Sequence, residues 1–196
     1  MKVNEIFYSL QGEGYYAGTP AVFVRFSGCN LHCPFCDTRH EKGREMSEEE
    51  IVAAVLEYPA RHVVVTGGEP ALQLTASLVD KLHAAGKYVA VETNGTLPLP
   101  ENIDWITLSP KSAFVNGAEV GLTCANEIKI LFDGIHDPNE QLSIFNFQFS
   151  TFLFLQPLDT GDPVRNAAIQ KAAVEYIKEH PRWRLSLQIH KILSIQ

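Results

Sequence analysis

The sequence predicts an α/β fold: a single-domain partial (β/α) barrel of about six parallel strands with an incomplete helical layer. Short apolar runs alternate with helical patterns along most of the 196 residues, as they do in βαβ units. The length falls short of the ~250 residues usual for a complete (β/α)8 barrel. The connections at 96–103 and 110–126 show no helical pattern, so the helical layer is expected to be incomplete. No repeat or linker divides residues 1–196, which are expected to form one domain.

The expected strands are short segments rich in β-branched and aromatic residues. They cover 21–26, 62–66, 87–92, 104–109, 127–132 and 151–156, with 183–189 as one further candidate. A capping box at Ser47 and Glu50 predicts a first helix that ends near Tyr58. A second helix is expected from Pro70 to a glycine cap at Gly86, and a third from 162–163 to about 180.

The charge and hydropathy of the chain exclude several function classes. Sixteen Lys and Arg against 23 Asp and Glu give a formal net charge of −7, so general attraction to nucleic acid or to anionic lipid is not expected. No apolar run approaches the ~18 residues of a membrane span, and the first residues lack the apolar core of a signal peptide. A cytoplasmic protein is expected.

Three of the four cysteines crowd into one short segment directly after the first expected barrel strand. Cys29, Cys33 and Cys36 have the spacing C-x3-C-x2-C, whereas Cys124 is distant and is expected to be a buried small apolar residue. Three thiolates can hold three irons of a [4Fe-4S] cluster and leave the fourth iron open to a small molecule. The alternative is a zinc site that takes a fourth ligand from His32, Asp37, His40 or Cys124.

Polar or glycine-rich segments follow the ends of the expected strands. These segments are Cys29, 67–69, 92–95, 109–111 and 156–159. The carboxyl ends of parallel strands meet at one rim, where α/β proteins bind their ligands. The sequence therefore predicts a single site at this rim.

The cysteine loop, with Phe35 before its last cysteine, and the Gly67-Gly68-Glu69-Pro70 segment resemble the radical S-adenosylmethionine (SAM) enzymes. The resemblance implies that the open iron chelates the amino and carboxylate groups of SAM. Reductive cleavage of SAM then gives a 5′-deoxyadenosyl radical that abstracts hydrogen from substrate. In such enzymes the cofactor carries the hard chemistry, and the protein orients it and excludes water.

A narrower resemblance covers nearly the whole chain, from about residue 4 to the last residue. The segments 8–14, 25–31, 36–38, 109–111, 156–159 and 188–191 together resemble the 7-carboxy-7-deazaguanine synthase family. That resemblance implies ring contraction of 6-carboxy-5,6,7,8-tetrahydropterin to 7-carboxy-7-deazaguanine with loss of ammonia, on the route to queuosine and related deazapurines. The alternative within the radical enzymes is an activase that makes a glycyl radical on a partner protein.

The resemblance also implies roles for individual residues. The cluster ligands are Cys29, Cys33 and Cys36. The SAM contacts are Phe35, Cys36, Asp37, Gly68, Ser109, Pro110, Lys111, Gln156, Pro157, Leu158 and Asp159. The substrate contacts are Leu10, Gln11, Gly12, Arg25, Thr66 and Gln196.

Three of these assigned residues have an alternative role or depart from the family pattern. Arg25 suits a substrate carboxylate, although a structural ion pair is the alternative. Thr38 is expected to hold Mg²⁺ together with substrate oxygens and water, or else only to cap a turn. Gln196 stands where the resemblance leads us to expect proline. A homodimer and a flavodoxin- or ferredoxin-type reductant are also implied, as is a substrate site completed by the N- and C-terminal segments.

Overall fold

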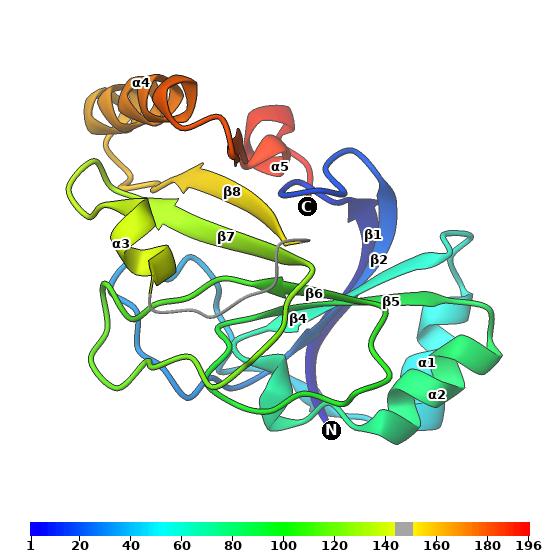
Figure 1. Cartoon of the computed structure of the whole chain (residues 1–196). Coiled ribbons are helices and arrows are strands. Elements are labelled where there is room, and N and C mark those ends of the chain that lie inside the picture. Colours follow the sequence, from blue (N-terminus) through cyan, green and yellow to red (C-terminus); the bar gives the residue numbers. More distant parts are fainter. Residues whose placement is uncertain (144–150) are drawn as a thin grey trace.

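A computed structural model describes residues 1–143 and 151–196, and within them nine strands form one curved sheet (Figure 1). The strands are β1 (Lys2–Leu10), β2 (Pro20–Phe26), β3 (Arg44–Glu45), β4 (His62–Gly67), β5 (Tyr88–Thr93), β6 (Trp105–Leu108), β7 (Glu127–Phe132), β8 (Phe152–Pro157) and β9 (Trp183–Leu185). Their order in the sheet is β3-β1-β2-β4-β5-β6-β7-β8-β9. From β2 to β9 every neighbouring pair is parallel.

The six expected strands are confirmed as β2 and β4 to β8, each within one residue of its expected bounds. The expected parallel, partial-barrel architecture is confirmed with them. The last expected strand is wrong in its extent, because β9 ends at Leu185 and a short helix, α5 (Ile189–Leu193), follows. The chain leaves the sheet at Ser186, whose hydroxyl donates to Gln156 Oε1 at 2.9 Å.

Two strands were not expected from the sequence. β1 pairs antiparallel with β2, and the two-residue β3 pairs with the start of β1. The β1–β2 register contains one irregularity: Val3 pairs with Phe26, and Glu5 then pairs with Arg25, so Asn4 is an extra residue. This bulge breaks the regular alternation of side chains by which β1 could have been identified.

The helices agree with expectation except in one segment. In α1 (Glu48–Leu56), Glu50 N donates to Ser47 Oγ at 3.2 Å and Ser47 N donates to Glu50 Oε2 at 2.7 Å, which confirms the capping box. The single helix expected from Pro70 is instead a 3-10 turn, η1 (Pro70–Leu72), followed by α2 (Ala76–Ala84). Thr75 interrupts it, because its hydroxyl accepts from Leu78 N and caps a new helix.

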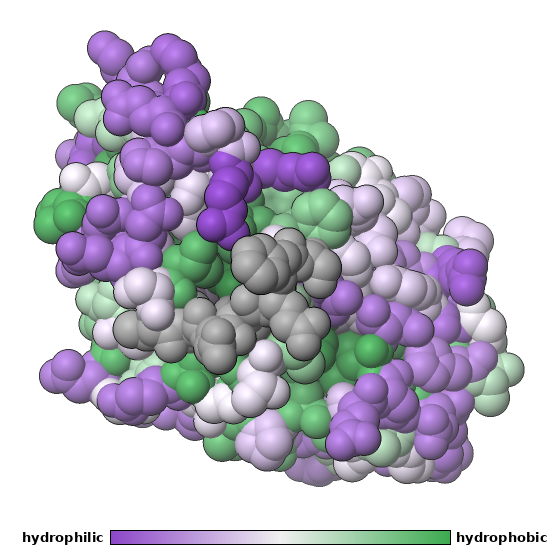
Figure 2. Space-filling model, viewed as in Figure 1, coloured by the Kyte–Doolittle hydropathy of each residue, from purple (hydrophilic) through white to green (hydrophobic). Residues whose placement is uncertain are grey.

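The remaining helices leave much of the sheet uncovered, as expected. α1 and α2 pack together on the outer face, where Ile51, Leu78 and Leu82 meet the valines of β2, β4 and β5. α4 (Pro163–Glu179) packs over β8 and β9 through Ile169 and Ala173, and Figure 2 shows hydrophilic residues over its outer side at the upper left. α3 (Pro138–Ser143) is a short helix after β7. Among the described residues, 96–103 and 110–126 contain no helix.

The inner face of the sheet is apolar at one end and polar at the other. Phe7, Phe23, Val64, Ala90 and Trp105 fill the interior toward the amino ends of the parallel strands. Toward the carboxyl ends the inward positions carry Arg25, Thr66, Glu92, Lys129 and Gln156. Since side chains alternate along a strand, the same strands build the apolar outer core and this polar interior.

Candidate active site

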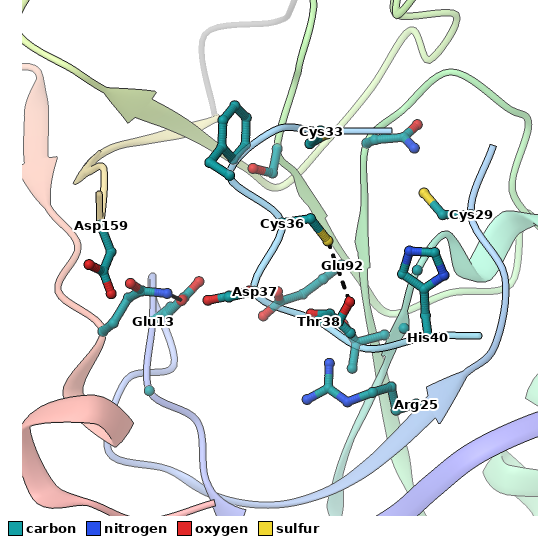
Figure 3. A pocket seen from close by; sticks show the side chains of 18 of the residues that line it. Glu13, Arg25, Cys29, Cys33, Cys36, Asp37, Thr38, His40, Glu92 and Asp159 are labelled. Carbon is teal, nitrogen blue, oxygen red and sulfur yellow. Dashed lines mark hydrogen bonds between the residues drawn. The ribbon is translucent and has the colours of Figure 1, made fainter. Parts of the chain in front are cut away.

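A cavity of about 1250 Å³ opens at the carboxyl ends of the parallel strands (Figure 3). Its lining comes from β1, β2, β4, β5, β7 and β8, from the cysteine loop and from the C-terminal segment. Pockets for one small molecule usually span about 300–1,000 Å³. The cavity is therefore large enough for a cofactor and a second ligand together.

The cavity brings together nearly all the residues expected from the sequence to form the site. Its lining includes Leu10, Gln11, Gly12, Arg25, Cys29, Cys33, Phe35, Cys36, Asp37, Thr38, Thr66, Gly68, Ser109, Lys111, Gln156, Pro157, Leu158, Asp159 and Gln196. The exception is Pro110, which is buried and does not line the cavity. It lies between Ser109 and Lys111, which both line the cavity.

The three clustered cysteines lie along one wall, and Figure 3 shows Arg25 and Thr38 beside them. Cys36 N donates to Cys33 O at 3.1 Å, and Leu31 N donates to Cys29 Sγ at 3.4 Å. Burial raises the pKa of the Cys29 and Cys33 thiols, and the neighbouring cysteines raise it further. Three thiols on one cavity can give the thiolates that an iron–sulfur cluster needs, and binding of the cluster would release their protons. The donor set therefore suits a cluster held by three thiolates.

Close backbone approach holds the cysteine loop against β4. A Cβ at position 68 would lie 2.1 Å from Gly28 O and 2.8 Å from Cys29 Cβ, so only glycine fits there. Next to it, the fully buried Glu69 accepts from Asn94 N at 2.8 Å and from Thr93 Oγ1 at 2.7 Å. Burial raises the pKa of Glu69, although these donors oppose the effect. The carboxylate thus braces the β4 and β5 ends without entering the cavity lining.

A second link joins the cysteine loop to the segment after β5. Asn94 Nδ2 donates to Asn30 Oδ1 at 3.1 Å, and Asn30 Nδ2 donates to Thr96 Oγ1 at 2.7 Å. These amides fix the loop from the side opposite His40, whose carbonyl accepts from Gly28 N at 2.9 Å. The loop is therefore held in place before any cofactor binds.

A buried charge network occupies the cavity opposite the cysteines. Lys129, only 4% exposed, pairs with Glu13 and lies 3.4 Å from Glu92 Oε2. Gln11 Nε2 donates to Glu92 Oε1 at 2.9 Å. Burial works to lower the pKa of Lys129, but the carboxylates outweigh burial and raise it above its ordinary value. Burial works to raise the pKa of Glu13, but Lys129 holds it below its ordinary value.

Two further groups in this region have displaced pKa values. Burial, with repulsion from Lys129, lowers the pKa of Lys111 to about 8. Lys111 Nζ donates to Ser109 O at 2.6 Å and to Ser109 Oγ at 2.7 Å. Burial raises the pKa of Glu127 to about 7, and its carboxylate accepts from Tyr15 N at 2.9 Å. Such displaced values are common at functional sites.

The C-terminal segment closes the seam between the two edges of the sheet, next to β1 and β2 in Figure 1. Ile189 N donates to Gly12 O at 3.0 Å, and Gln188 Nε2 donates to Glu13 Oε1 at 3.0 Å. Lys191 Nζ lies 3.0 Å from Asp37 Oδ2 and 2.8 Å from Asp159 Oδ2. One lysine thus connects the cysteine loop, the end of β8 and α5.

Several lining residues were not expected from the sequence. They include Glu5, Glu13, Lys129, His190 and Lys191, whereas Glu92 belongs to the expected rim segment 92–95. Glu127 and Lys129 alternate with isoleucines in β7, and a charged residue inside an apolar strand is a signal that could have found them. Glu13 and Lys191 lie within segments already singled out as motifs, but their partners are distant in sequence.

The structure also decides between some of the alternatives. Cys124 is exposed and lies outside the cavity, so its expected burial is wrong. The described residues hold no group of three or more His, Cys, Asp or Glu side chains arranged for a single metal ion. Arg25 pairs with Glu5 and also lines the cavity. Residues 37–40 form no turn, so Thr38 caps none.

Within the described part of the chain, every helix is too short or too polar to cross a membrane.

Comparisons with known proteins agree with this geometry. A family profile, the Radical SAM superfamily, matches residues 23–145. The chain is 51% identical to a 7-carboxy-7-deazaguanine synthase of Bacteroides thetaiotaomicron, over 100% of this chain and 98% of that protein. It is 44% identical to the enzyme of the same name from Burkholderia multivorans, over 98% of each. The crystal structure of QueE from Escherichia coli superposes with a TM-score of 0.81 at 31% identity, over 96% of this chain and 94% of that one.

Proposed function

The chain belongs to the 7-carboxy-7-deazaguanine synthase family of radical SAM enzymes, and from this premise we propose how its cavity is divided among cofactors and substrate. Membership gives the reaction: ring contraction of 6-carboxy-5,6,7,8-tetrahydropterin to 7-carboxy-7-deazaguanine with release of ammonia, in queuosine biosynthesis. It also overturns the zinc-module and glycyl-radical-activase alternatives. The observation that carries the proposal is the convergence of the cysteine loop and Arg25 on one cavity.

The cysteine wall is the proposed cofactor half of the cavity. The family implies a [4Fe-4S] cluster and SAM, which together supply, when bound, a carbon-centred radical that takes a hydrogen atom from substrate. Cys29, Cys33 and Cys36 would hold the cluster. Gly68 lines the cavity beside these cysteines and would contact the methionyl group of SAM.

The nucleoside of SAM would lie along a set of rim residues. They are Phe35, Asp37, Ser109, Lys111 and 156–159. The assignment of Pro110 changes from a contact to a support, because it does not reach the lining. Phe35 is held in place by an edge contact with the Phe114 ring, at 5.1 Å between centroids.

The polar inner face is the proposed substrate half. The substrate carboxylate suits the Arg25 guanidinium, because a guanidinium can donate two parallel hydrogen bonds to a carboxylate. The amide of Gln11, the backbone near Leu10 and Gly12, and Thr66 supply polar groups for the pterin ring. Gln196 completes this half, so both end segments of the chain contribute to the substrate site.

We propose a Mg²⁺ site at Thr38, which lines the cavity between the cysteines and Arg25 (Figure 3). Mg²⁺ takes most of its ligands from substrate and water, so one hydroxyl is a sufficient protein anchor. The ion would polarise and orient substrate oxygens. The resemblance supports this site, together with a homodimer, a flavodoxin- or ferredoxin-type donor and a reducing cytoplasmic setting.

The test is product formation by the reconstituted enzyme under anaerobic conditions. Protein, SAM, 6-carboxy-5,6,7,8-tetrahydropterin, Mg²⁺ and a chemical reductant should give 7-carboxy-7-deazaguanine, identified by mass spectrometry. Cys33→Ala should abolish SAM cleavage, whereas Cys124→Ala is the matched control and should keep it, since Cys124 lies outside the cavity. SAM cleavage without any deazaguanine product in the unmodified enzyme would contradict the proposal.

A further inference from the structure

Glu5 lies directly opposite Arg25, in the regular register that runs on to Leu10 and Pro20, and a bulge in β1 adjoins this pair. Val3 pairs with Phe26, so Asn4 is the extra residue. In regular pairing Asn4 would oppose Phe26 and face the side of the sheet away from Glu5, since successive side chains alternate between the two faces. Bulges often re-aim a side chain next to an active site. Here both Asn4 and Glu5 line the cavity as a result.

The bulge also lets Asn4 hold the chain beyond the cysteine loop. Asn4 Nδ2 donates to Arg39 O at 2.6 Å and to Lys42 O at 3.1 Å. Asn4 and Glu5 are consecutive residues of β1, and both lie on the cavity side: Asn4 binds the chain beyond the cysteine loop and Glu5 pairs with Arg25. In a regular strand, consecutive side chains point to opposite faces of the sheet.

The Glu5 carboxylate divides its two oxygens between Arg25 and Gln196. Oε1 accepts from Arg25 Nε at 2.8 Å, and Oε2 accepts from Gln196 Nε2 at 2.9 Å. A guanidinium carries five N–H donors, and the bond at Nε leaves both terminal nitrogens free for another acceptor. Arg25 Cζ also lies 5.8 Å from the centre of the Phe7 ring, so the guanidinium is held from two directions.

We propose that Glu5 is a positioning residue for substrate: it takes the Nε–H of Arg25, turns the terminal nitrogens toward the cavity, and fastens Gln196 to the same wall. The inference rests on the proposed function, in which Arg25 binds the substrate carboxylate. It gives Gln196 a role specific to this chain, because the expected proline has no side-chain amide to donate.

The charge of Glu5 and its hydrogen bond to Arg25 have opposite effects on the affinity for the substrate carboxylate, which makes the inference testable. A carboxylate beside Arg25 repels an incoming carboxylate, whereas a fixed guanidinium binds one better. Glu5→Gln keeps an oxygen acceptor for Arg25 Nε and removes the charge. Glu5→Ala removes both.

The probe is 6-carboxypterin, whose fluorescence reports binding to the cluster-loaded enzyme with SAM, and pterin without the carboxylate is the comparison ligand. Glu5→Ala should raise the dissociation constant of 6-carboxypterin about tenfold or more, as expected for losing a hydrogen bond that orients a charged group. Glu5→Gln should bind it as tightly as the unmodified enzyme or more tightly. Pterin should bind equally to all three proteins.

Two further measurements separate this inference from the proposed function. In the Arg25→Ala background, Glu5→Ala should have no additional effect on 6-carboxypterin binding. In the ligand-free enzyme, Glu5→Ala should speed amide exchange in residues 189–195. Glu5→Gln should speed it less, because the Gln196 amide can turn its oxygen toward the new NH2 group.

Three outcomes would overturn the positioning role. They are tighter 6-carboxypterin binding by both Glu5 variants, equal losses for the two pterins, and unchanged amide exchange in Glu5→Ala. If the unmodified enzyme binds neither pterin, the proposed function fails, while the exchange measurement still tests the link between Glu5 and Gln196. Thermal unfolding of each variant shows whether the substitution prevents folding. If Glu5→Ala does not fold, binding of the two pterins by Glu5→Gln still tests the inference.

Discussion

Replacing Lys129 with methionine should destabilise the protein strongly, because the change leaves a buried carboxylate without its partner. Lys129 is 4% exposed and Glu13 13% exposed, whereas Glu92 is 25% exposed and 3.4 Å away. Removing one member of a buried ion pair costs about 3–5 kcal/mol. The more exposed Glu92 contributes the smaller share, about 1 kcal/mol or less. We therefore expect a loss of about 3–5 kcal/mol at pH 8.

The loss should depend on pH in a defined direction. In the folded protein Lys129 outweighs burial and holds the pKa of Glu13 below its ordinary value of 4.5, so the stabilisation is present above that pH and fades as pH falls. Without Lys129, burial is opposed only by the smaller effects of Gln188 and His190 and raises the pKa of Glu13, so the variant loses stability as pH rises. The difference between the two proteins should be larger at pH 8 than at pH 5.

The assay is urea unfolding of the reduced, cluster-free chain, followed by circular dichroism at both pH values. Adding Glu13→Gln to Lys129→Met should recover most of the stability, because the unpaired charge is then gone. Lys171→Met, at an exposed lysine of α4, is the matched control and should change little. A Lys129→Met variant within about 1 kcal/mol of the unmodified protein at pH 8 would refute the reasoning, as would a further loss on adding Glu13→Gln.

Three other predictions concern single residues, two that line the cavity and one that is buried beside it. Arg25→Ala should weaken 6-carboxypterin binding by roughly 2–5 kcal/mol and leave SAM binding unchanged, and equal losses in two binding titrations would mean that Arg25 supports the fold instead. Thr38→Ala should shift the Mg²⁺ titration of the product to 5′-deoxyadenosine ratio to higher concentration, and superimposable curves would place the ion elsewhere. Burial raises the pKa of Glu127 from 4.5 to about 7, so the proton it holds stabilises the folded protein at low pH and is lost as pH rises through 7. Glu127→Gln should therefore gain stability relative to the unmodified protein between pH 5 and pH 8 in urea unfolding, and a difference independent of pH would contradict the assigned burial effect.

The parallel strands were predictable because each carries its own local signal. β7 matches its expected bounds, and its apolar, β-branched residues indicate a strand without reference to any partner. α1 likewise begins at a capping box that lies within four consecutive residues. By contrast, β1 carries a bulge at Asn4, and α5 is a five-residue helix whose N-cap Gln188 makes no side-chain cap bond. Local patterns do not report such elements, because their stability comes from tertiary contacts.

The residues of the candidate site also differ in whether the sequence alone could identify them. The cysteine loop was recognisable because its ligands lie within eight residues of one another. The pairing of Glu13 with Lys129 spans 116 residues, and that of Glu5 with Gln196 spans 191. Only the curved, folded sheet brings such partners together, so neither composition nor spacing could identify them. Cys124 was misjudged for a related reason, because burial of a lone cysteine depends on the course of an irregular loop.

The seam between the sheet edges makes the cavity sensitive to cleavage of the C-terminal segment. The strands end at Leu185, and the residues that close the seam are synthesised after all of them. A chain cut after Leu185 would retain every described strand but lose Gln188, Lys191 and Gln196. The sheet can therefore stay folded while the cavity loses part of its lining. Trimming by a protease within that segment would abolish catalysis while leaving the sheet folded, so an assay of folding alone would miss the damage.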